Sequence, residues 1–241
     1  MSTAVIIPCY NEEKRLNIPA YEIFAKSYTQ FHLYFVNDGS TDNTRLLLKD
    51  FCKKNPTAKF LDLKVNTGKG NAIRESVLAL LINDYDFIAY LDADLSTPLE
   101  ELLFFSEVFK AKPSTQCVTG ARVDLLGRNV HRKLSRHYFG RIFATFASLA
   151  LNLNIYDTQC GAKIFRKKMA SEIFQKPFIS RWLFDIELLF RMKKSKQIPN
   201  ISGAIYEFPL TSWVDTPGSK LKLIDFIKAP YELLKIYMHY H

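Results

Sequence analysis

Phe87-Ile88-Ala89-Tyr90-Leu91-Asp92-Ala93-Asp94 gives the clearest indication of the fold. Five apolar or aromatic residues in succession are typical of a strand that is buried on both faces of a parallel sheet. The run stops at two acidic residues one position apart, so we expect the strand to end there. The sequence therefore predicts a buried strand over Phe87–Leu91 with an acidic tip.

Upstream of this strand, β-rich runs alternate with helical patterns. The expected strands cover Thr3–Pro8, His32–Asn37 and Lys59–Lys64, and the expected helices cover about Glu12–Tyr28, Asp42–Lys54 and Gly70–Ile82. Strands that alternate with helices predict βαβ units and a mostly parallel, doubly wound α/β sheet. Such sheets bind ligands beyond the carboxyl ends of their strands, where polar residues follow the first two of these runs and the Phe87–Leu91 run.

The second half of the chain is less regular. Its expected elements are a strand over Cys117–Ala121, a long helix over about Arg128–Leu153, a short strand over Ala162–Phe165, an amphipathic helix over Trp182–Lys194, a strand over Ile201–Phe208 and an amphipathic helix within Lys220–His241. The sequence contains no internal repeat, low-complexity segment or linker. We therefore expect one domain over residues 1–241.

The composition excludes a disordered chain and indicates an anionic partner. Of the 241 residues, 48% are hydrophobic and 24% are charged, as in ordinary globular proteins. Lys and Arg number 33 against 24 Asp and Glu, which gives a net charge of +9. Nucleic acid, a phosphorylated substrate and an acidic membrane surface would each suit this charge.

Cysteine spacing and hydropathy indicate the compartment. The four cysteines form no C-x-x-C pair, which argues against a zinc site and favours reduced packing thiols in the cytosol. The N-terminus lacks the pattern of a signal peptide. The longest uncharged run, Ile142 to Tyr156, falls short of the roughly 18 apolar residues of a membrane span. We expect no membrane-spanning segment.

Asp92 and Asp94 have the residue type and spacing of a metal site. A hard cation such as Mg²⁺ or Mn²⁺ prefers oxygen ligands, and one or two carboxylates usually hold it together with substrate phosphates. A solvated turn would show the same D-x-D pattern, but the buried strand before it favours a ligand site.

Two further segments follow strands of the same predicted sheet. Asp38 precedes Gly39, which permits a tight turn, and its carboxylate could read a base N–H or merely cap the turn. Lys69 stands between Gly68 and Gly70 at an expected helix start, where backbone N–H groups and a cation suit a phosphate. The segment is not a Walker A loop.

A basic stretch precedes the uncharged run. Its members are Arg122, Arg128, Arg132, Lys133, Arg136 and Arg141. Arg128, Arg132 and Arg136 would share one helix face at i, i+4 and i+8. A solvated helix face is the plainer interpretation. The apolar residues that follow suit a lipid phosphate held at a membrane surface.

Together these segments resemble the family 2 inverting glycosyltransferases of GT-A fold. The resemblance is carried by Val5–Glu13 (VIIPCYNEE), Val36–Asp42 (VNDGSTD) and Asp92-Ala93-Asp94. Within that family the chain looks like the polyprenyl-phosphate glycosyltransferases, particularly the dolichyl-phosphate β-glucosyltransferases. That closer match lies in Asp157–Phe165 (DTQCGAKIF), Arg181–Leu189 (RWLFDIELL) and Gly218–Leu221 (GSKL).

The resemblance implies a nucleotide-sugar half over residues 1–122 and an acceptor half with membrane-surface helices over 123–241. The implied nucleotide-sugar residues are Pro8, Tyr10, Asn11, Glu12, Asp38, Gly39, Lys69, Gly70, Asp92, Ala93 and Arg122. The implied acceptor residues are Arg132, Arg136, Gly161, Glu187 and Lys220. Asp92, Asp94 and Asp157 would be catalytic, with Mg²⁺ or Mn²⁺ on Asp94. Ser96 departs from the mannosyl relatives, which place a glutamine ligand there.

The expected reaction is transfer of a hexose, glucose from UDP-glucose as the best match, to a polyprenyl or dolichyl phosphate. The enzyme would lie peripherally on the cytoplasmic face of a membrane. A saccharide hydroxyl is the alternative acceptor, and Asp157 or Glu187 would then have to act as a general base. A nucleic-acid-binding module is disfavoured, because the sequence lacks interleaved basic and aromatic residues.

Overall fold

The computed structural model of the chain describes residues 1–131, 134–216 and 223–241, without side chains at 134–139 and 223–227. The strands are β1 (Thr3–Cys9), β2 (Phe31–Asp38), β3 (Ala58–Leu63), β4 (Phe87–Tyr90), β5 (Cys117–Ala121), β6 (Asn129–His131), β7 (Lys163–Arg166), β8 (Ile205–Pro209) and β9 (Ser212–Val214). The helices are α1 (Ile18–Ser27), α2 (Thr44–Lys54), α3 (Lys69–Leu80), α4 (Glu101–Ala111), α5 (Leu134–Leu151), α6 (Lys167–Ile173), α7 (Phe184–Lys194), α8 (Ile201–Ala204) and α9 (Leu223–Tyr240).

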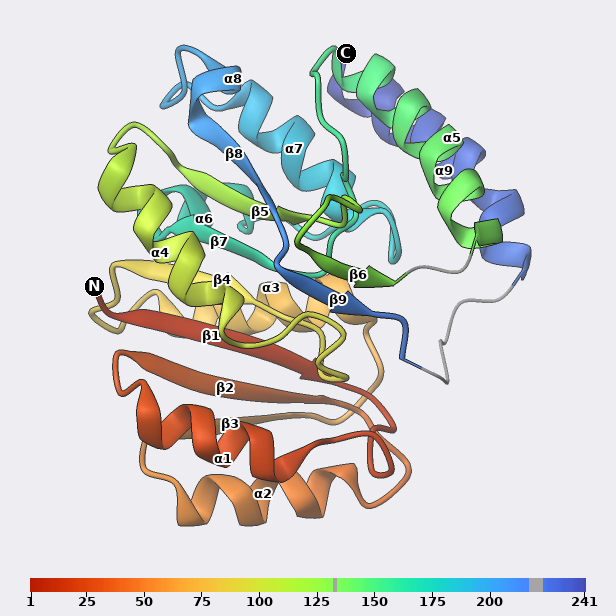
Figure 1. Ribbon diagram of the computed structural model, residues 1–241. Coiled ribbons are helices and arrows are strands. Elements are labelled where there is room, and N and C mark those ends of the chain that lie inside the picture. The colour runs from red at the N-terminus through yellow and green to blue at the C-terminus, as the bar shows by residue number, and fades with distance from the viewer. Residues whose placement is uncertain (132–133, 217–222) are drawn as a thin grey trace.

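A seven-stranded sheet forms the centre of the molecule, with helices on both faces (Figure 1). Its strand order is β3-β2-β1-β4-β7-β5-β8. The pairs are parallel except at β7, which runs antiparallel to both β4 and β5. The predicted mostly parallel, doubly wound sheet is confirmed.

Alternate residues of β1 enter two different cores. Val5, Ile7 and Cys9 belong to the cluster that includes buried residues of α1, α2 and α4. Ala4 and Ile6 belong to the cluster that includes residues of α3, α6 and α7. Since both faces are covered, β1 reads as one continuous apolar run, as central parallel strands do.

The helix after β1 begins later than the sequence predicts. The side chain of Asn17 caps α1 by accepting a hydrogen bond from the Ala20 backbone N–H at 3.2 Å, and Pro19 occupies the first turn. Residues 12–17 instead form a loop, with a turn at residues 13–15, beyond the carboxyl end of β1. This loop carries Glu12 and Arg15 to the edge of the sheet.

The prediction that a helix begins at Arg128 is wrong. Asn129–His131 forms β6, which pairs with β9, and the Asn129 N–H bonds to the Thr211 carbonyl at 2.9 Å. Val130 is buried between exposed neighbours, the alternation of a strand. Arg128 therefore does not share a helix face with Arg136. The partner strand lies some 80 residues downstream, so local periodicity could not reveal the pairing.

Helices α5 and α9 lie side by side and form a third core with α7 (Figure 1). Ala147, Leu189 and Ile236 are buried there, one from each helix. None of the helices in the described parts of the chain is long and apolar enough to cross a membrane.

The cysteines pack in the protein without disulfides. Cys9, Cys117 and Cys160 are buried and Cys52 is partly buried, all as thiols. Burial raises the pKa of Cys117 to about 12 and that of Cys160 to about 11, so these thiols stay protonated and unreactive near neutral pH.

Candidate active site

The tips of β1, β2 and β4 meet at one edge of the sheet. In the parallel register Cys9 lies beside Asn37, and Ile6 lies beside Tyr90. The loops that follow these strands are therefore neighbours, as the sequence predicts. The acidic pair follows β4 and occupies the middle of this edge, because β1 and β4 are central strands.

The segment that carries the acidic pair is held by a hydrogen bond from helix α1 and by a tight turn of its own backbone. The buried Tyr21 hydroxyl donates to the Ala93 carbonyl at 3.0 Å. The Asp94 Oδ1 accepts the Ser96 N–H at 3.1 Å across a tight turn in which Leu95 has a φ of 53°. The Ser96 carbonyl in turn accepts the Val214 N–H of β9 at 3.0 Å. Ser96 thus shapes the turn through its backbone.

A different cation pairs with each acid. The Lys69 Nζ, from the start of α3, lies 2.5 Å from Asp92 Oδ1. The Arg15 Nη2, from the turn after β1, lies 2.6 Å from Asp94 Oδ2. Burial alone lowers the pKa of Lys69, but the carboxylates of Asp92 and Asp185 outweigh it and raise that pKa above its ordinary value. Lys69 is therefore charged at neutral pH.

The loops after β1 and β2 are tied to each other. The Asn11 N–H donates to Ser40 Oγ at 3.0 Å, and the Asn11 side-chain oxygen accepts the Thr41 N–H at 2.8 Å. The Glu12 N–H donates to Thr44 Oγ1 at 2.7 Å. Asn11 thus ties together the two loops between which a nucleoside is predicted to bind. Pro8 and Tyr10, which are also predicted to contact the nucleoside, precede Asn11 in the same segment.

Asp38 organises the loop before α3. Its Oδ1 accepts the Thr67 N–H at 2.7 Å and its Oδ2 accepts the Gly68 N–H at 2.9 Å, while the side chain is almost wholly buried. The structure thus places Asp38 as an anchor of the segment that carries Lys69. Contact of Asp38 with a nucleoside stays a prediction.

Three predicted glycines lie where a side chain would collide. Gly39 has a φ of +66°, and a Cβ there would lie 2.5 Å from the Asn66 backbone nitrogen. A Cβ on Gly70 would lie 2.7 Å from the Phe184 ring. A Cβ on Gly161 would lie only 1.9 Å from Asp92 Oδ2, so this glycine backs directly onto the acidic pair.

Arg122 and Asp157 form a closed ion pair at the tip of β5. The guanidinium donates from Nε to Asp157 Oδ2 at 2.6 Å and from Nη2 to Oδ1 at 2.8 Å, a bidentate geometry. Burial lowers the pKa of Arg122, but Asp157 outweighs it and raises that pKa above its ordinary value. Asp157 is nearly buried, so its carboxylate serves first as the partner of Arg122.

Glu187 does not face this edge of the sheet. Its side chain is 0% exposed and accepts hydrogen bonds from the Ile179 N–H at 2.8 Å, Arg191 at 2.7 Å and the Tyr240 hydroxyl at 2.9 Å. The structure gives Glu187 a packing role between α7 and α9. Direct contact with an acceptor would require this network to open.

The other predicted acceptor residues are not described as side chains. Arg132 and Lys220 lie outside the described residues, and only the backbone of Arg136 is described, within α5. Their roles stay predictions.

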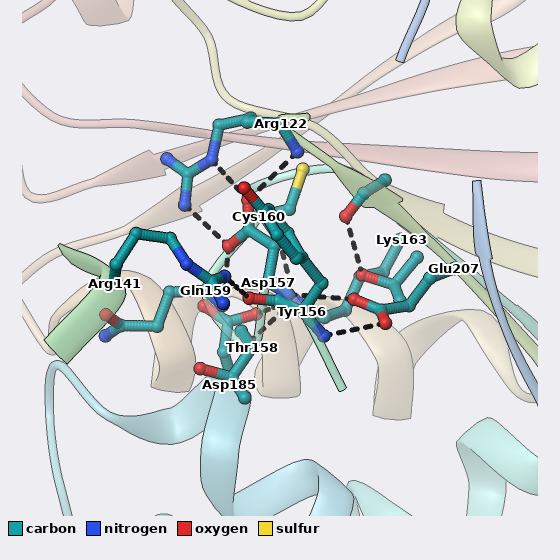
Figure 2. A network of polar contacts seen from close by, with 12 residues as sticks. Arg122, Arg141, Tyr156, Asp157, Thr158, Gln159, Cys160, Lys163, Asp185 and Glu207 are labelled. Atoms are coloured by element: carbon teal, nitrogen blue, oxygen red, sulfur yellow. Dashed lines mark hydrogen bonds and ion pairs between the residues drawn. The ribbon is translucent and has the colours of Figure 1, made fainter. Parts of the chain in front are cut away.

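Sequence reasoning missed a buried network beneath the site (Figure 2). The Lys163 side chain is 1% exposed, and its Nζ donates to the Cys160 carbonyl at 2.7 Å and to Asp185 Oδ1 at 2.7 Å. The Tyr90 hydroxyl donates to the same Asp185 oxygen at 2.5 Å. This network joins β4, which ends at the acidic pair, to the loop that carries Asp157 and Gly161. A lysine among apolar residues in a predicted strand was the available signal.

Glu207 of β8 supports the same loop from the other side (Figure 2). Its carboxylate accepts the backbone N–H groups of Tyr156 and Asp157, each at 2.8 Å. Burial raises the pKa of Glu207 above its ordinary value, although these hydrogen bonds oppose the shift. Arg15 was also missed, since it stood in a segment predicted as helix.

The acidic tip has the chemistry that a divalent cation requires. The carboxylates of Asp92 and Asp94 are oxygen donors, are 36% and 18% exposed, and are already balanced by cations. Among the described residues, no group of three or more His, Cys, Asp or Glu side chains could hold a metal. The two carboxylates are the ligand types that a hard cation would share with substrate phosphates.

Comparison with known proteins gives a consistent family. The profile of glycosyl transferase family 2 matches residues 4–174. A dolichyl-phosphate beta-glucosyltransferase of Trichomonas vaginalis is 29% identical over 99% of this chain and 71% of its own length. The Homo sapiens enzyme of that name is 30% identical over 90% of this chain and 69% of its own length.

Solved structures share the fold. Glucosyl-3-phosphoglycerate synthase of Mycobacterium tuberculosis superposes with a TM-score of 0.71 at 16% identity, over 99% of this chain and 80% of that one. The same enzyme in complex with Mn²⁺ and UDP-glucose superposes equally well, with a TM-score of 0.71. The sheet, the acidic strand tip and the sequence match agree: the chain is a glycosyltransferase of GT-A fold that belongs to glycosyl transferase family 2.

Proposed function

We propose that this enzyme transfers glucose from UDP-glucose to the phosphate of a polyprenyl lipid such as dolichyl phosphate, with inversion at the anomeric carbon. The observation that carries the proposal is the acidic tip of β4, with Lys69 and Arg15 beside it, in a chain that matches dolichyl-phosphate beta-glucosyltransferases along nearly its whole length.

The donor would lie along the tips of β1, β2 and β4. The nucleoside fits the loops that Asn11 and Asp38 hold in shape. Asp94, with Asp92 beside it, would hold Mg²⁺ or Mn²⁺, which would stabilise the departing diphosphate when bound. Lys69, whose Nζ lies 2.5 Å from Asp92, would add a positive charge beside the same phosphates.

The acceptor's chemistry matches the residues on the other side of the acidic pair. A phosphate monoester is anionic at pH 7, so its oxygen can attack the anomeric carbon, and the bond from that carbon to the UDP oxygen breaks in line. No proton has to be removed. No free carboxylate is needed as a base, which suits a site where Asp157 is paired with Arg122 and where Glu187 is enclosed away from this edge of the sheet.

Helices α5 and α9 supply a surface that suits a membrane. Each helix exposes large apolar side chains at helical spacing: Ile142, Phe146 and Leu149 on α5, and Tyr231, Leu234 and Met238 on α9. Lys228 and Lys235 of α9 are also exposed. Apolar residues with nearby lysines are typical of helices that lie in the headgroup region of anionic membranes. We propose that this face holds the enzyme on the cytoplasmic surface of a membrane.

A saccharide hydroxyl is the second candidate acceptor. A poly-beta-1,6-N-acetyl-D-glucosamine synthase of Staphylococcus epidermidis is 35% identical over 48% of this chain and 27% of its own length. Such an acceptor needs a general base. The paired states of Asp157 and Glu187 make this candidate the weaker one.

A donor screen tests the proposal. The purified chain is incubated with a short polyprenyl phosphate, Mn²⁺ and one of UDP-glucose, UDP-galactose, UDP-N-acetylglucosamine or GDP-mannose. We expect UDP-glucose to give the fastest formation of lipid-linked sugar. Faster transfer from GDP-mannose would overturn the assignment of the donor.

A further inference from the structure

Arg15 bridges two carboxylates at the candidate site. Its Nη2 lies 2.6 Å from Asp94 Oδ2, and its Nε lies 3.0 Å from Glu12 Oε2. The Arg15 side chain is 21% exposed, and it belongs to the turns that follow β1 rather than to a helix. Arg15 is thus placed at the accessible edge of the sheet, where a ligand could replace it.

The local charges are nearly balanced as the structure stands. Glu12, Asp92 and Asp94 supply three negative charges, and Arg15 and Lys69 supply two positive ones, which leaves −1. Removing Arg15 would leave −2. The affinity of this edge for any further cation therefore depends on whether Arg15 stays on Asp94.

We propose that Arg15 is a displaceable counter-ion that opposes binding of a divalent cation until the nucleotide diphosphate is present. The inference rests on the proposed function, because it assumes that the donor is a nucleotide diphosphate sugar. With no nucleotide, Arg15 neutralises the Asp94 oxygen that a divalent cation would need. With the diphosphate bound, Arg15 has a second anionic partner. Moving the Arg15 side chain away from Asp94 then costs less free energy.

Linkage gives this arrangement a measurable consequence. A guanidinium 2.6 Å from Asp94 Oδ2 and a divalent cation on the same oxygen repel each other, so one weakens the other. Since UDP offers Arg15 another partner, UDP should strengthen metal binding, and metal should strengthen UDP binding by the same factor. In a variant without Arg15, the metal should bind more tightly in the absence of UDP. The factor by which UDP strengthens metal binding should then be smaller.

Metal binding measured directly tests this inference. The full chain, Arg15→Gln, Arg15→Lys and the control Arg45→Gln are titrated with Mn²⁺, with and without UDP, and free Mn²⁺ is read from its electron paramagnetic resonance signal. Arg45 is a matched control because it too forms an Arg–Asp pair, with Asp62 at 2.6 Å. We expect Arg15→Gln to bind Mn²⁺ alone about three- to tenfold more tightly than wild type.

The same titration gives the other expected results. UDP should strengthen Mn²⁺ binding by a smaller factor in Arg15→Gln than in wild type. Arg15→Lys keeps a cation near Asp94 and should stay within about twofold of wild type, as should Arg45→Gln.

Two outcomes would overturn the inference. One is wild-type or weaker Mn²⁺ affinity in an Arg15→Gln protein whose melting temperature is unchanged. The other is an equal gain in Arg15→Lys, which would mean that the charge at this position is not responsible. Because metal affinity is read without turnover, either outcome is separate from failure of the proposed function, which wild-type glucosyl transfer tests on its own.

Discussion

Replacing Gly161 by alanine would push directly on the acidic pair. The added Cβ would lie 1.9 Å from Asp92 Oδ2 and 2.6 Å from its Cγ. Ordinary contact begins at 3.4 Å, so the two groups must separate by 3.4 − 1.9, or about 1.5 Å. The loop cannot easily move, since Lys163 binds the Cys160 carbonyl at 2.7 Å. We therefore expect the Asp92 side chain to move and its contact with Lys69 to break.

The expected size of the effect follows from that displacement. Misplacing a group by about 1 Å in an active site can cost on the order of 100-fold in rate. A 100-fold loss corresponds to about 2.7 kcal/mol of transition-state stabilisation. We expect kcat/KM for glucosyl transfer in Gly161→Ala to fall by about that factor, while the melting temperature falls by only a few degrees.

Gly203→Ala provides the matched control. A Cβ at Gly203 would have its nearest neighbour at 3.6 Å, on the Asn200 side chain, so the same substitution meets no clash there. Its kcat/KM should stay within about twofold of wild type. Turnover of Gly161→Ala within about threefold of wild type, in a folded protein, would refute the claim that Gly161 positions Asp92.

Three further predictions address the metal, the buried network and the membrane face. Asp94→Ala should abolish transfer while circular dichroism shows an intact fold; turnover like wild type would count against the proposed site. Lys163→Met should lower the free energy of unfolding by about 3–5 kcal/mol, because it leaves Asp185 buried without its cation; a loss below about 1 kcal/mol in urea denaturation would contradict this. Phe146→Asp should weaken sedimentation with anionic phospholipid vesicles at least about tenfold, whereas Ile82→Asp, on an even more exposed residue of another surface, should not; equal effects would argue against the α5–α9 face.

The sheet and the acidic tip could be predicted because they depend on local patterns. Strands β1 and β4 are apolar runs buried on both faces, β2 is mostly buried, and polar residues lie at or just after the end of each strand. In a parallel sheet the carboxyl ends of neighbouring strands lie at the same edge, so the position of these ends follows from the sheet type alone. The same rule applies to the segment after β3, which carries Lys69 to this edge, where it contacts Asp92.

The remaining features depend on contacts that a local pattern does not contain. Strand β6 is stabilised by its pairing with β9, which lies far downstream in the sequence. The local pattern of these residues does not contain that pairing and instead indicates the start of a helix. The cation on Asp94 comes from the turn after β1, which resembled helix in sequence. The ion pair between Arg122 and Asp157 could not be predicted, because the two residues lie 35 positions apart in the sequence.

The chemical group of the acceptor that receives the glucose distinguishes the proposed reaction from its alternative. The wild-type chain with UDP-glucose and Mn²⁺ is offered dolichyl phosphate, the matching dolichol without phosphate, and a saccharide acceptor, and the products are analysed by mass spectrometry and by NMR of the anomeric proton. We predict a β-linked glucosyl phosphate lipid from dolichyl phosphate alone. Transfer to the saccharide hydroxyl in preference to the lipid phosphate, or an α-linked product, would contradict this prediction.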